Sequence, residues 1–344
     1  MDIGVSVIIP TFNREHLISE TIESIISQSF RAAEIIVIDD GSTDHTEHAV
    51  AQYGDLVKYI KISNSGVCKA RNVGVENSKS EWIAFCDSDD IWHQDKLLHQ
   101  VELIRNSDNV EYCFTNFQTF KGNHWSKKTK FDDSPDDYWD IPRLDINNYA
   151  FVITEPFYSK VLQFTPIFPS TVMMKKTFFN RIGRFNEDFG RKISEDFEFT
   201  LRCVQEKPIG VIIKPVVGIR KHEQNFSSGN MPGISFVIGD IDILNYSSQN
   251  HRLGSEHQSL IEEQIISRSI SVAHGAFGFG EFRILRDILK NVPTSRRSIK
   301  LWIKEAIAFL PTPLAKFVQQ SITTPGRTSL NRKNLLFSGA ENVD

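Results

Sequence analysis

The segment Val5–Arg14 (VSVIIPTFNR) begins as a run of apolar, largely β-branched residues and ends in a polar turn. The same pattern returns at residues 35–44 (IIVIDDGSTD) and 82–90 (WIAFCDSDD). Strands that are apolar along their whole length are typical of parallel sheets, because helices cover both faces of such a sheet. These three segments therefore predict central strands of one parallel sheet.

Helical patterns separate these strands. Amphipathic stretches at residues 15–27, 43–52, 67–77 and 93–105 alternate with the strands and with one more predicted strand at 57–62. This alternation predicts an α/β protein built as an open, doubly wound sandwich. In such sheets, ligands bind beyond the carboxyl ends of the strands.

The later part of the chain changes character twice. Residues 119–164 look irregular and hold ten aromatic residues, after which we expect a strand at 170–175 and a helix at 195–206. We expect short strands at 211–213 and 216–220, and from residue 235 onward only helices, for example at 260–273 and 282–289. We place a domain boundary near residue 230, with a mainly helical region over 231–344.

The composition is that of an ordinary soluble protein: 344 residues, 40% hydrophobic and 24% charged. We expect no membrane-spanning helix and no secretory signal, because apolar runs are short and the first residues are not basic. The four cysteines are far apart and form no CxxC pair, which predicts neither a disulfide framework nor a zinc site. The cytoplasm is the expected compartment.

The net charge of −4 is unevenly distributed. Residues 283–333 contain 11 Lys or Arg and 2 Asp or Glu, so this segment is basic and the rest of the chain is acidic. Its apolar and basic residues suit an amphipathic segment on an anionic membrane surface, and a helical appendage or a dimer contact is an equal alternative. We expect no nucleic acid partner, and the sequence leaves the oligomeric state open.

Acidic residues follow two of the predicted strands. Asp39-Asp40 ends one strand, and Asp87, Asp89 and Asp90 end another. On one edge of a parallel sheet these carboxylates would repel one another unless a cation lay between them, and a divalent ion shared with substrate phosphates meets that need. Helix capping and turn formation are the alternative roles for these residues.

The sequence contains neither GxGxxG after the first strand nor a P-loop, so a phosphate must be bound in another way. A metal ion at Asp89 would neutralise a diphosphate, assisted by Lys69, Arg71 and the start of their helix. A solvated helix face is the alternative for those two cations.

Two further segments carry candidate site residues. Glu195 and Asp196 begin a predicted helix, where acidic residues either stabilise the helix dipole or provide a general base. His222 follows the last predicted strand and would lie at the same edge of the sheet.

Taken in order, these motifs resemble the family 2 glycosyltransferases, which have the GT-A fold. The resemblance covers about residues 3–227 and rests on residues 6–13 (SVIIPTFN), 38–44 (IDDGSTD), 70–74 (ARNVG), 85–90 (FCDSDD) and Glu195-Asp196. It implies a nucleotide-sugar enzyme with a GT-A domain over residues 1–230.

The resemblance also implies roles for individual residues. Pro10, Thr11 and Asp39 match positions that line the nucleotide pocket, with Asp39 facing the base, and Arg71 matches a position near the nucleotide. Asp87-Ser88-Asp89 matches the DxD element: Asp87 approaches the ribose and Asp89 holds the metal.

For the reacting groups, Asp196 matches the catalytic base, with Glu195 beside it. His222 resembles a histidine near the diphosphate and the metal. The implied cofactor is a divalent metal ion, Mn²⁺ or Mg²⁺.

The implied activity is an inverting transfer of a sugar from a nucleotide-diphosphate donor, with UDP-sugars favoured, to a hydroxyl of a glycan or a lipid-linked acceptor. Such a reaction belongs to the synthesis of cell-surface polysaccharides or glycoconjugates. The aromatic residues of 119–164 fall where family members build acceptor sites, and we expect them to pack on one another rather than on sugars. We expect a cytoplasmic protein, peripheral on the inner membrane face if the basic segment binds lipid.

Two alternatives stay open at this point. A sugar-phosphate nucleotidyltransferase uses a similar sheet, a metal and carboxylates, but would carry a glycine- and lysine-rich loop after the first strand, where this chain has Pro10–Arg14. A non-catalytic module that binds a nucleotide sugar or a glycan would not need Asp39, Asp87, Asp89 and Asp196 together.

Overall fold

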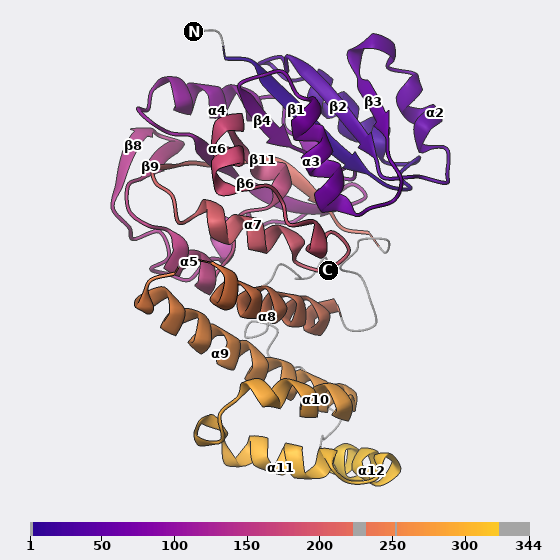
Figure 1. Cartoon of the computed structure of the whole chain (residues 1–344), viewed down its shortest axis with the longest axis vertical. Helices are drawn as coiled ribbons and strands as arrows, with labels where there is room; N and C mark the ends of the chain where they lie inside the picture. Colours follow the sequence, from indigo (N-terminus) through magenta and orange to yellow (C-terminus); the bar gives the residue numbers. More distant parts are fainter. Residues whose placement is uncertain (1–2, 223–231, 252, 323–344) are drawn as a thin grey trace. The chain divides into compact units, whose positions relative to one another are not determined.

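The computed structural model describes residues 3–222, 232–251 and 253–322 (Figure 1). The chain forms two compact units, one within residues 1–161 and 166–223 and the other within residues 162–165 and 224–342. The boundary that the sequence suggests near residue 230 lies outside the described residues.

The first unit is built on one mixed sheet with the strand order β3-β2-β1-β4-β10-β6-β11-β9-β8; β5 also pairs with β11 and β7 with β6. The strands are β1 (Val5–Thr11), β2 (Glu34–Asp39), β3 (Lys58–Lys61), β4 (Trp82–Phe85), β5 (Ile91–Trp92), β6 (Tyr112–Lys121), β7 (His124–Trp125), β8 (Arg143–Asn147), β9 (Ala150–Ile153), β10 (Met173–Lys175) and β11 (Ile209–Arg220).

The direction of the strands decides where the site lies. β1 runs parallel to β2 and β4, β2 to β3, and β6 to β11. β10 is antiparallel to both β4 and β6, so those two strands also run the same way. The carboxyl ends of β1, β2, β4, β6 and β11 therefore lie at one edge of the sheet, as the sequence predicts for the first three.

Helices cover both faces of this sheet, which explains why its central strands are apolar throughout. α1 and α4 pack on one face in the main core cluster, and α3 packs on the other face against Ile36 and Ile38. The helices up to residue 203 are α1 (Ile18–Ile26), α2 (Thr46–Ala51), α3 (Val67–Asn77), α4 (Lys96–Arg105), α5 (Tyr158–Gln163), α6 (Lys176–Ile182) and α7 (Glu195–Cys203).

Three details differ from the sequence-based expectation. The two short strands expected at 211–213 and 216–220 are one strand, β11, whose register shifts around Pro215. The strand expected from residue 170 starts at Met173, because residues 169–171 form a 3-10 turn. Residues 119–164 are more regular than predicted, since they include β7, β8, β9 and α5.

The aromatic residues of this segment pack on one another, as expected. The rings of Phe131, Trp139 and Phe157 form successive contacts with centroid distances of 4.4 Å and 6.0 Å, and Tyr138 packs on Phe157 at 5.7 Å. Trp125 stacks on Phe120, yet its side chain is still 47% exposed.

The second unit is helical within the described residues. Its helices are α8 (Pro232–Asn250), α9 (Ser255–Phe279), α10 (Phe282–Ile288), α11 (Ile299–Ala308) and α12 (Thr312–Ile322). Over the described part of the chain, none of the helices combines the length and the apolar character needed to cross a bilayer.

Candidate active site

The ends of β1 and β2 form the first part of the site. Thr11 is paired with Asp39 in the sheet, and the backbone N–H of Asp40 donates to the Thr11 carbonyl at 2.8 Å. Thr11 is only 3% exposed, and its hydroxyl has no hydrogen-bond partner among the described residues. A buried hydroxyl without a partner is costly unless a ligand or water completes it, which suits a pocket-lining role for Thr11 and for Pro10 before it.

Asp39 is fully buried at the end of β2. One carboxylate oxygen accepts from the Ser42 N–H at 2.7 Å, and the other accepts from the Tyr59 hydroxyl. Burial and the Asp39 carboxylate together raise the pKa of Tyr59 well above its usual range. Asp39 thus has the turn-forming role that its sequence context suggests, and its contact with a nucleotide base stays a prediction.

Asp40 has a structural function that the sequence did not reveal. Its carboxylate accepts from the N–H groups of Ser65 at 2.6 Å and Gly66 at 2.8 Å, which fixes the loop before α3. Gly66 has a φ of +95°, and a Cβ placed there would lie 2.6 Å from the carbonyl oxygen of Gly190. The loops that precede α3 and α7 therefore pack closely against each other, with no room for a side chain at Gly66.

Arg71 is the centre of the site. Its side chain is 2% exposed, and its guanidinium contacts an Asp87 oxygen at 2.8 Å and a Glu195 oxygen at 3.1 Å. These two carboxylates raise the pKa of Arg71 further, although burial opposes the shift. A solvated helix face is therefore wrong for Arg71, while Lys69 on the same helix is partly exposed and pairs with Glu187.

Asp196 lies beside this network, in the first turn of α7. It lines a small cavity whose other walls include Phe85, Phe185 and Phe199. Burial, followed by the neighbouring Glu195 carboxylate, raises the pKa of Asp196 from its usual 3.8 to about 8. Burial also raises the pKa of Glu195, against the effect of Arg71. A carboxylate that exchanges a proton near neutral pH has the property required of a general base.

Asp89 and His222 meet at the same edge. The Nε2 atom of His222 lies 2.9 Å from Oδ2 of Asp89, and Nε of Arg14 lies 3.7 Å from that oxygen. Although burial opposes it, the contacts with His222 and Arg14 lower the pKa of Asp89. The expected proximity of Asp89 and His222 is therefore present.

This donor set fits a hard divalent ion only in part. Among the described residues, no cluster of three or more His, Cys, Asp or Glu side chains suits a metal. One carboxylate and one imidazole leave most coordination positions to substrate and water, which is the usual arrangement for ions that bridge protein and phosphate. Asp89 and His222 are thus compatible with an ion that arrives with a diphosphate.

The turn that carries these carboxylates is anchored by two residues absent from the predicted site. The buried Asp90 contacts the Ser170 hydroxyl at 2.5 Å and accepts from the backbone N–H of Arg220 at 3.1 Å. The Ser170 hydroxyl also accepts from the N–H of Asp87 at 2.9 Å. Asp90 could have been identified as the third acidic residue of the 87–90 turn. Nothing in the sequence indicates that Ser170 contacts this turn.

The structure thus brings the predicted residues into neighbouring groups along one edge. Arg71 joins Asp87 to Glu195, with Asp196 adjacent, and the same 87–90 turn supplies Asp89 for the contact with His222. The ends of β1 and β2 adjoin this turn because β1 pairs with both β2 and β4.

Residues 6–170 match the family model for glycosyl transferase family 2, so the chain carries a domain of this family. An uncharacterized glycosyltransferase of Rickettsia typhi is 27% identical over 222 residues, which cover 64% of each protein. The Escherichia coli UDP-Glc:alpha-D-GlcNAc-diphosphoundecaprenol beta-1,3-glucosyltransferase WfgD is 34% identical over 126 residues, 36% of this chain and 49% of WfgD. The chain therefore matches less than two thirds of the length of either relative.

Solved structures share the fold. S. aureus TarS 1-349 in complex with UDP-GlcNAc superposes with a TM-score of 0.63 at 21% identity, covering 93% of this chain and 92% of TarS 1-349. The mannosyltransferase PcManGT from Pyrobaculum calidifontis, in complex with GDP-Man and Mn²⁺, has a TM-score of 0.54 at 16% identity, covering 97% and 85%. At these identities the likeness concerns the fold, and it supports the expected GT-A architecture.

Proposed function

We propose that this protein transfers a sugar from a nucleotide-diphosphate donor to a hydroxyl group of a glycan or lipid-linked acceptor, with inversion at the anomeric carbon. The observation that carries the proposal is the network in which the buried Arg71 contacts Asp87 and Glu195, with Asp196 next to it. Arg71 and Asp87 lie within residues 6–170, which match the family 2 model. A role in cell-surface polysaccharide or glycoconjugate synthesis is supported by the relative WfgD, whose name gives a lipid diphosphate acceptor.

In the proposed reaction, Asp196 acts as the base. An acceptor hydroxyl gives its proton to the Asp196 carboxylate while its oxygen attacks C1 of the donor sugar. The bond between C1 and the diphosphate oxygen breaks, and the nucleoside diphosphate leaves from the opposite side, which inverts the configuration. Glu195 accepts a hydrogen bond from Arg71 at 3.1 Å and so holds the first turn of α7 in place.

The donor is proposed to lie along the strand ends. Pro10, Thr11 and Asp39 would line the nucleotide pocket, Asp87 would approach the ribose, and Arg71 would lie near the nucleotide. A UDP-sugar is favoured because WfgD is named for UDP-Glc and TarS 1-349 was crystallised with UDP-GlcNAc.

Asp89 and His222 would hold Mn²⁺ or Mg²⁺, which would act as a Lewis acid on the leaving diphosphate. The 2.9 Å contact between the two side chains supports this pairing, and the Mn²⁺ in PcManGT is a precedent within the fold. Chelation should stop the reaction, and full activity in excess EDTA would contradict this assignment.

A donor screen tests the activity. The protein is incubated with UDP- and GDP-sugars and Mn²⁺, and the release of nucleoside diphosphate is followed. Slow release is expected for a transferase without its acceptor. Formation of pyrophosphate from a nucleoside triphosphate and a sugar phosphate would instead identify a nucleotidyltransferase.

The variant Asp196→Asn tests the base. It keeps the side chain's size but cannot accept the proton, so transfer should be abolished while the affinity for nucleotide stays close to that of the wild type. The exposed Asp188→Asn is a matched control and should retain activity. Turnover retained in Asp196→Asn would exclude the proposed role.

We also propose that the second unit contacts an anionic membrane, at the inner face of the cytoplasmic membrane. On α11, the side chains of Ile299, Trp302 and Ile303 are 79%, 44% and 52% exposed, a helical spacing that places them on one side. On α12, Phe317 is 68% exposed. Residues 283–322 carry eight Lys or Arg and two Asp or Glu, and residues 323–333 lie outside the described part.

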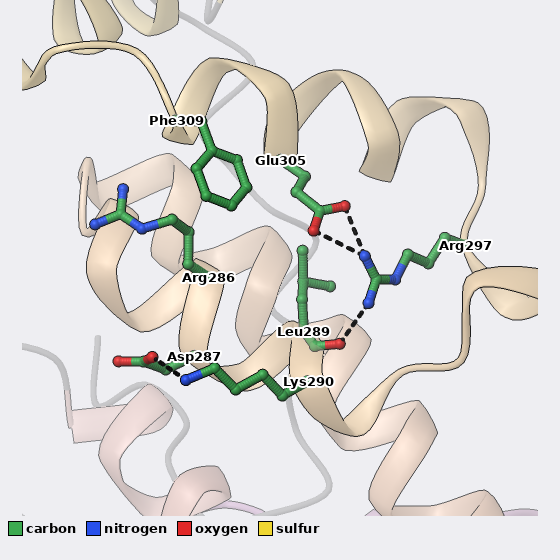
Figure 2. Close-up of a pocket in the computed structure, with 7 residues that line it drawn as sticks. All are labelled: Arg286, Asp287, Leu289, Lys290, Arg297, Glu305 and Phe309. Atoms are coloured by element: carbon green, nitrogen blue, oxygen red, sulfur yellow. Dashed lines mark hydrogen bonds and ion pairs between the residues drawn. The ribbon is translucent and has the colours of Figure 1, made fainter.

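Figure 2 shows one part of this unit, a pocket of about 350 Å³ between α10 and α11. The Arg286 guanidinium lies 5.7 Å from the centre of the exposed Phe309 ring, and Arg297 binds both carboxylate oxygens of Glu305. Cations next to exposed aromatic rings suit the interface between anionic headgroups and acyl chains.

Co-sedimentation with phosphatidylglycerol vesicles tests this contact. The double variant Phe309→Ser, Phe317→Ser should lose binding, whereas Leu56→Ser, which alters a 65% exposed side chain of the first unit, should not. Equal sedimentation of all three proteins would exclude the membrane surface and favour a dimer contact or internal packing.

A further inference from the structure

An exposed tryptophan lies on a hairpin next to the proposed active site. β6 and β7 are joined by the short turn Gly122-Asn123, and β7 pairs Trp125 with Phe120. The Trp125 side chain is 47% exposed although it belongs to a regular strand. A large aromatic ring at the surface buries a substantial apolar area when a ligand covers it.

The Trp125 ring is held in place. It stacks on Phe120 with a centroid distance of 4.7 Å and an interplanar angle of 16°. It also lies over Gly218 of β11, where an added Cβ would come within 2.6 Å of the indole. The N–H of Ser126 donates to the Thr119 carbonyl at 2.8 Å, which fixes the hairpin backbone. A ring that is already ordered loses little conformational entropy on binding.

The hairpin is continuous with the proposed site. The guanidinium carbon of Arg220 lies 4.5 Å from the centre of the Phe120 ring, and Nε of Arg220 donates to the Asp89 carbonyl at 2.7 Å. Phe120 and Arg220 are register partners at the carboxyl ends of β6 and β11. One chain of contacts thus runs from Trp125 through Phe120 and Arg220 to the turn of Asp89.

The hairpin is also strongly basic. Residues 121–130 (KGNHWSKKTK) contain four lysines and no acidic residue, within a part of the chain that is otherwise acidic. Lys121, Lys127 and Lys128 are exposed, and no ion pair joins them to an acidic side chain in the described part of the chain. Unpaired cations around a flat apolar surface complement a saccharide that carries a negative charge.

We propose that Trp125, with Lys121, Lys127 and Lys128, forms the binding platform for an acidic saccharide that serves as the acceptor. The apolar face of a sugar ring packs on the indole, and the lysines bind its phosphate or carboxylate groups. The proposal rests on the proposed glycosyltransferase function and adds the chemical class of the acceptor.

Binding is measured by ¹⁹F NMR on protein labelled with 5-fluorotryptophan, with UDP and the diamagnetic Mg²⁺ present to fill the donor site. The chain has five tryptophans, so each resonance can be assigned by a single Trp→Phe variant. The probes are tetragalacturonic acid, N-acetylglucosamine 1-phosphate, neutral chitotetraose and inorganic phosphate. Trp302 is an internal control, because it is similarly exposed at 44% and lies 5.2 Å from the Arg297 guanidinium in the second unit.

The Trp125 resonance should shift with at least one of the two acidic saccharides, at a Kd at least fivefold below that for chitotetraose, while the Trp302 resonance stays in place. Binding of tetragalacturonic acid would indicate that the lysines recognise carboxylate groups, and binding of N-acetylglucosamine 1-phosphate would indicate that they recognise phosphate. The triple variant Lys121→Gln, Lys127→Gln, Lys128→Gln should lose the preference for the acidic probe.

The variant Gly218→Ala keeps Trp125 but displaces its ring, and should weaken binding at least tenfold at an unfolding temperature within a few degrees of the wild type. A Trp125 resonance that responds to no saccharide, or equally to neutral saccharide or phosphate alone, would overturn the proposal. Donor turnover is assayed separately by UDP release. A protein that binds the acidic probe but never releases UDP would contradict the proposed function and leave the platform intact.

Discussion

The variant Asp196→Asn should change how the stability of the protein depends on pH. In the folded protein, burial and Glu195 raise the pKa of Asp196 to about 8, whereas the unfolded chain has the usual value of 3.8. Between these values the folded state binds a proton that the unfolded state has released. The contribution of Asp196 to the free energy of unfolding of the wild type therefore falls as the pH rises from about 4 to about 8.

The magnitude follows from the proton count. One proton held only by the folded state corresponds to about 1.4 kcal/mol per pH unit, or about 3 kcal/mol between pH 5 and 7. Asparagine has no proton to release, so this contribution disappears and Asp196→Asn should be the more stable protein at pH 7. Its lost activity and its gained stability would then have one cause, the burial of an ionisable base.

Two measurements test this reasoning. Urea unfolding at pH 5, 6 and 7 should show that the free energy of unfolding decreases more steeply with pH for the wild type than for Asp196→Asn. The control Asp188→Asn should show the same pH dependence as the wild type. In the wild type, kcat/KM should rise about tenfold per pH unit below pH 8 and then level off, because the ionised carboxylate is the active form. Parallel stability curves, or a kcat/KM that does not change with pH, would refute the assignment.

Two further predictions concern the framework of the site. Arg71→Gln leaves two carboxylates without their cation and should lower the free energy of unfolding in urea by about 3–5 kcal/mol. The control Arg181→Gln, at an exposed ion pair, should lower it by about 0–1 kcal/mol. Equal losses for the two variants would contradict the role of the buried Arg71. Gly66→Ala should lower the free energy of unfolding by about 1–3 kcal/mol more than Gly54→Ala does. Both glycines have a positive φ, but of the two only Gly66 faces a backbone carbonyl. Similar unfolding free energies for the two variants would argue against close packing of the loops before α3 and α7.

The central strands could be predicted from sequence because each buries both faces. β1, β2 and β4 are buried almost throughout and lie within a few residues of their predicted ranges, and α3 has the predicted bounds. β3, the partly exposed edge strand, also lies within its predicted range. By contrast, β8 is largely exposed and short, so its residues carry no apolar pattern that would reveal it. β11 was divided in two because Lys214 and Pro215 interrupt its apolar run, and the structure accommodates them as a register shift.

In the candidate site, too, local features could be predicted from the sequence, whereas contacts between distant residues could not. Acidic residues at strand ends are visible in the sequence, and parallel strands bring them to one edge. The burial of Arg71 was not visible, because a cation in a helical pattern looks the same whether it faces solvent or two carboxylates. The contact of Asp90 with Ser170 joins residues 80 positions apart, and such pairs leave no local signal.

By itself, the sequence determined the alternation of strands and helices, the order of the motifs and the chemistry of the strand ends, because these depend on neighbouring residues and on periodic burial. The tertiary structure alone decided which charges are paired, which carboxyl group has a raised pKa and which tryptophan is left at the surface. Those outcomes depend on desolvation and on contacts between distant segments, and both exist only once the chain has folded.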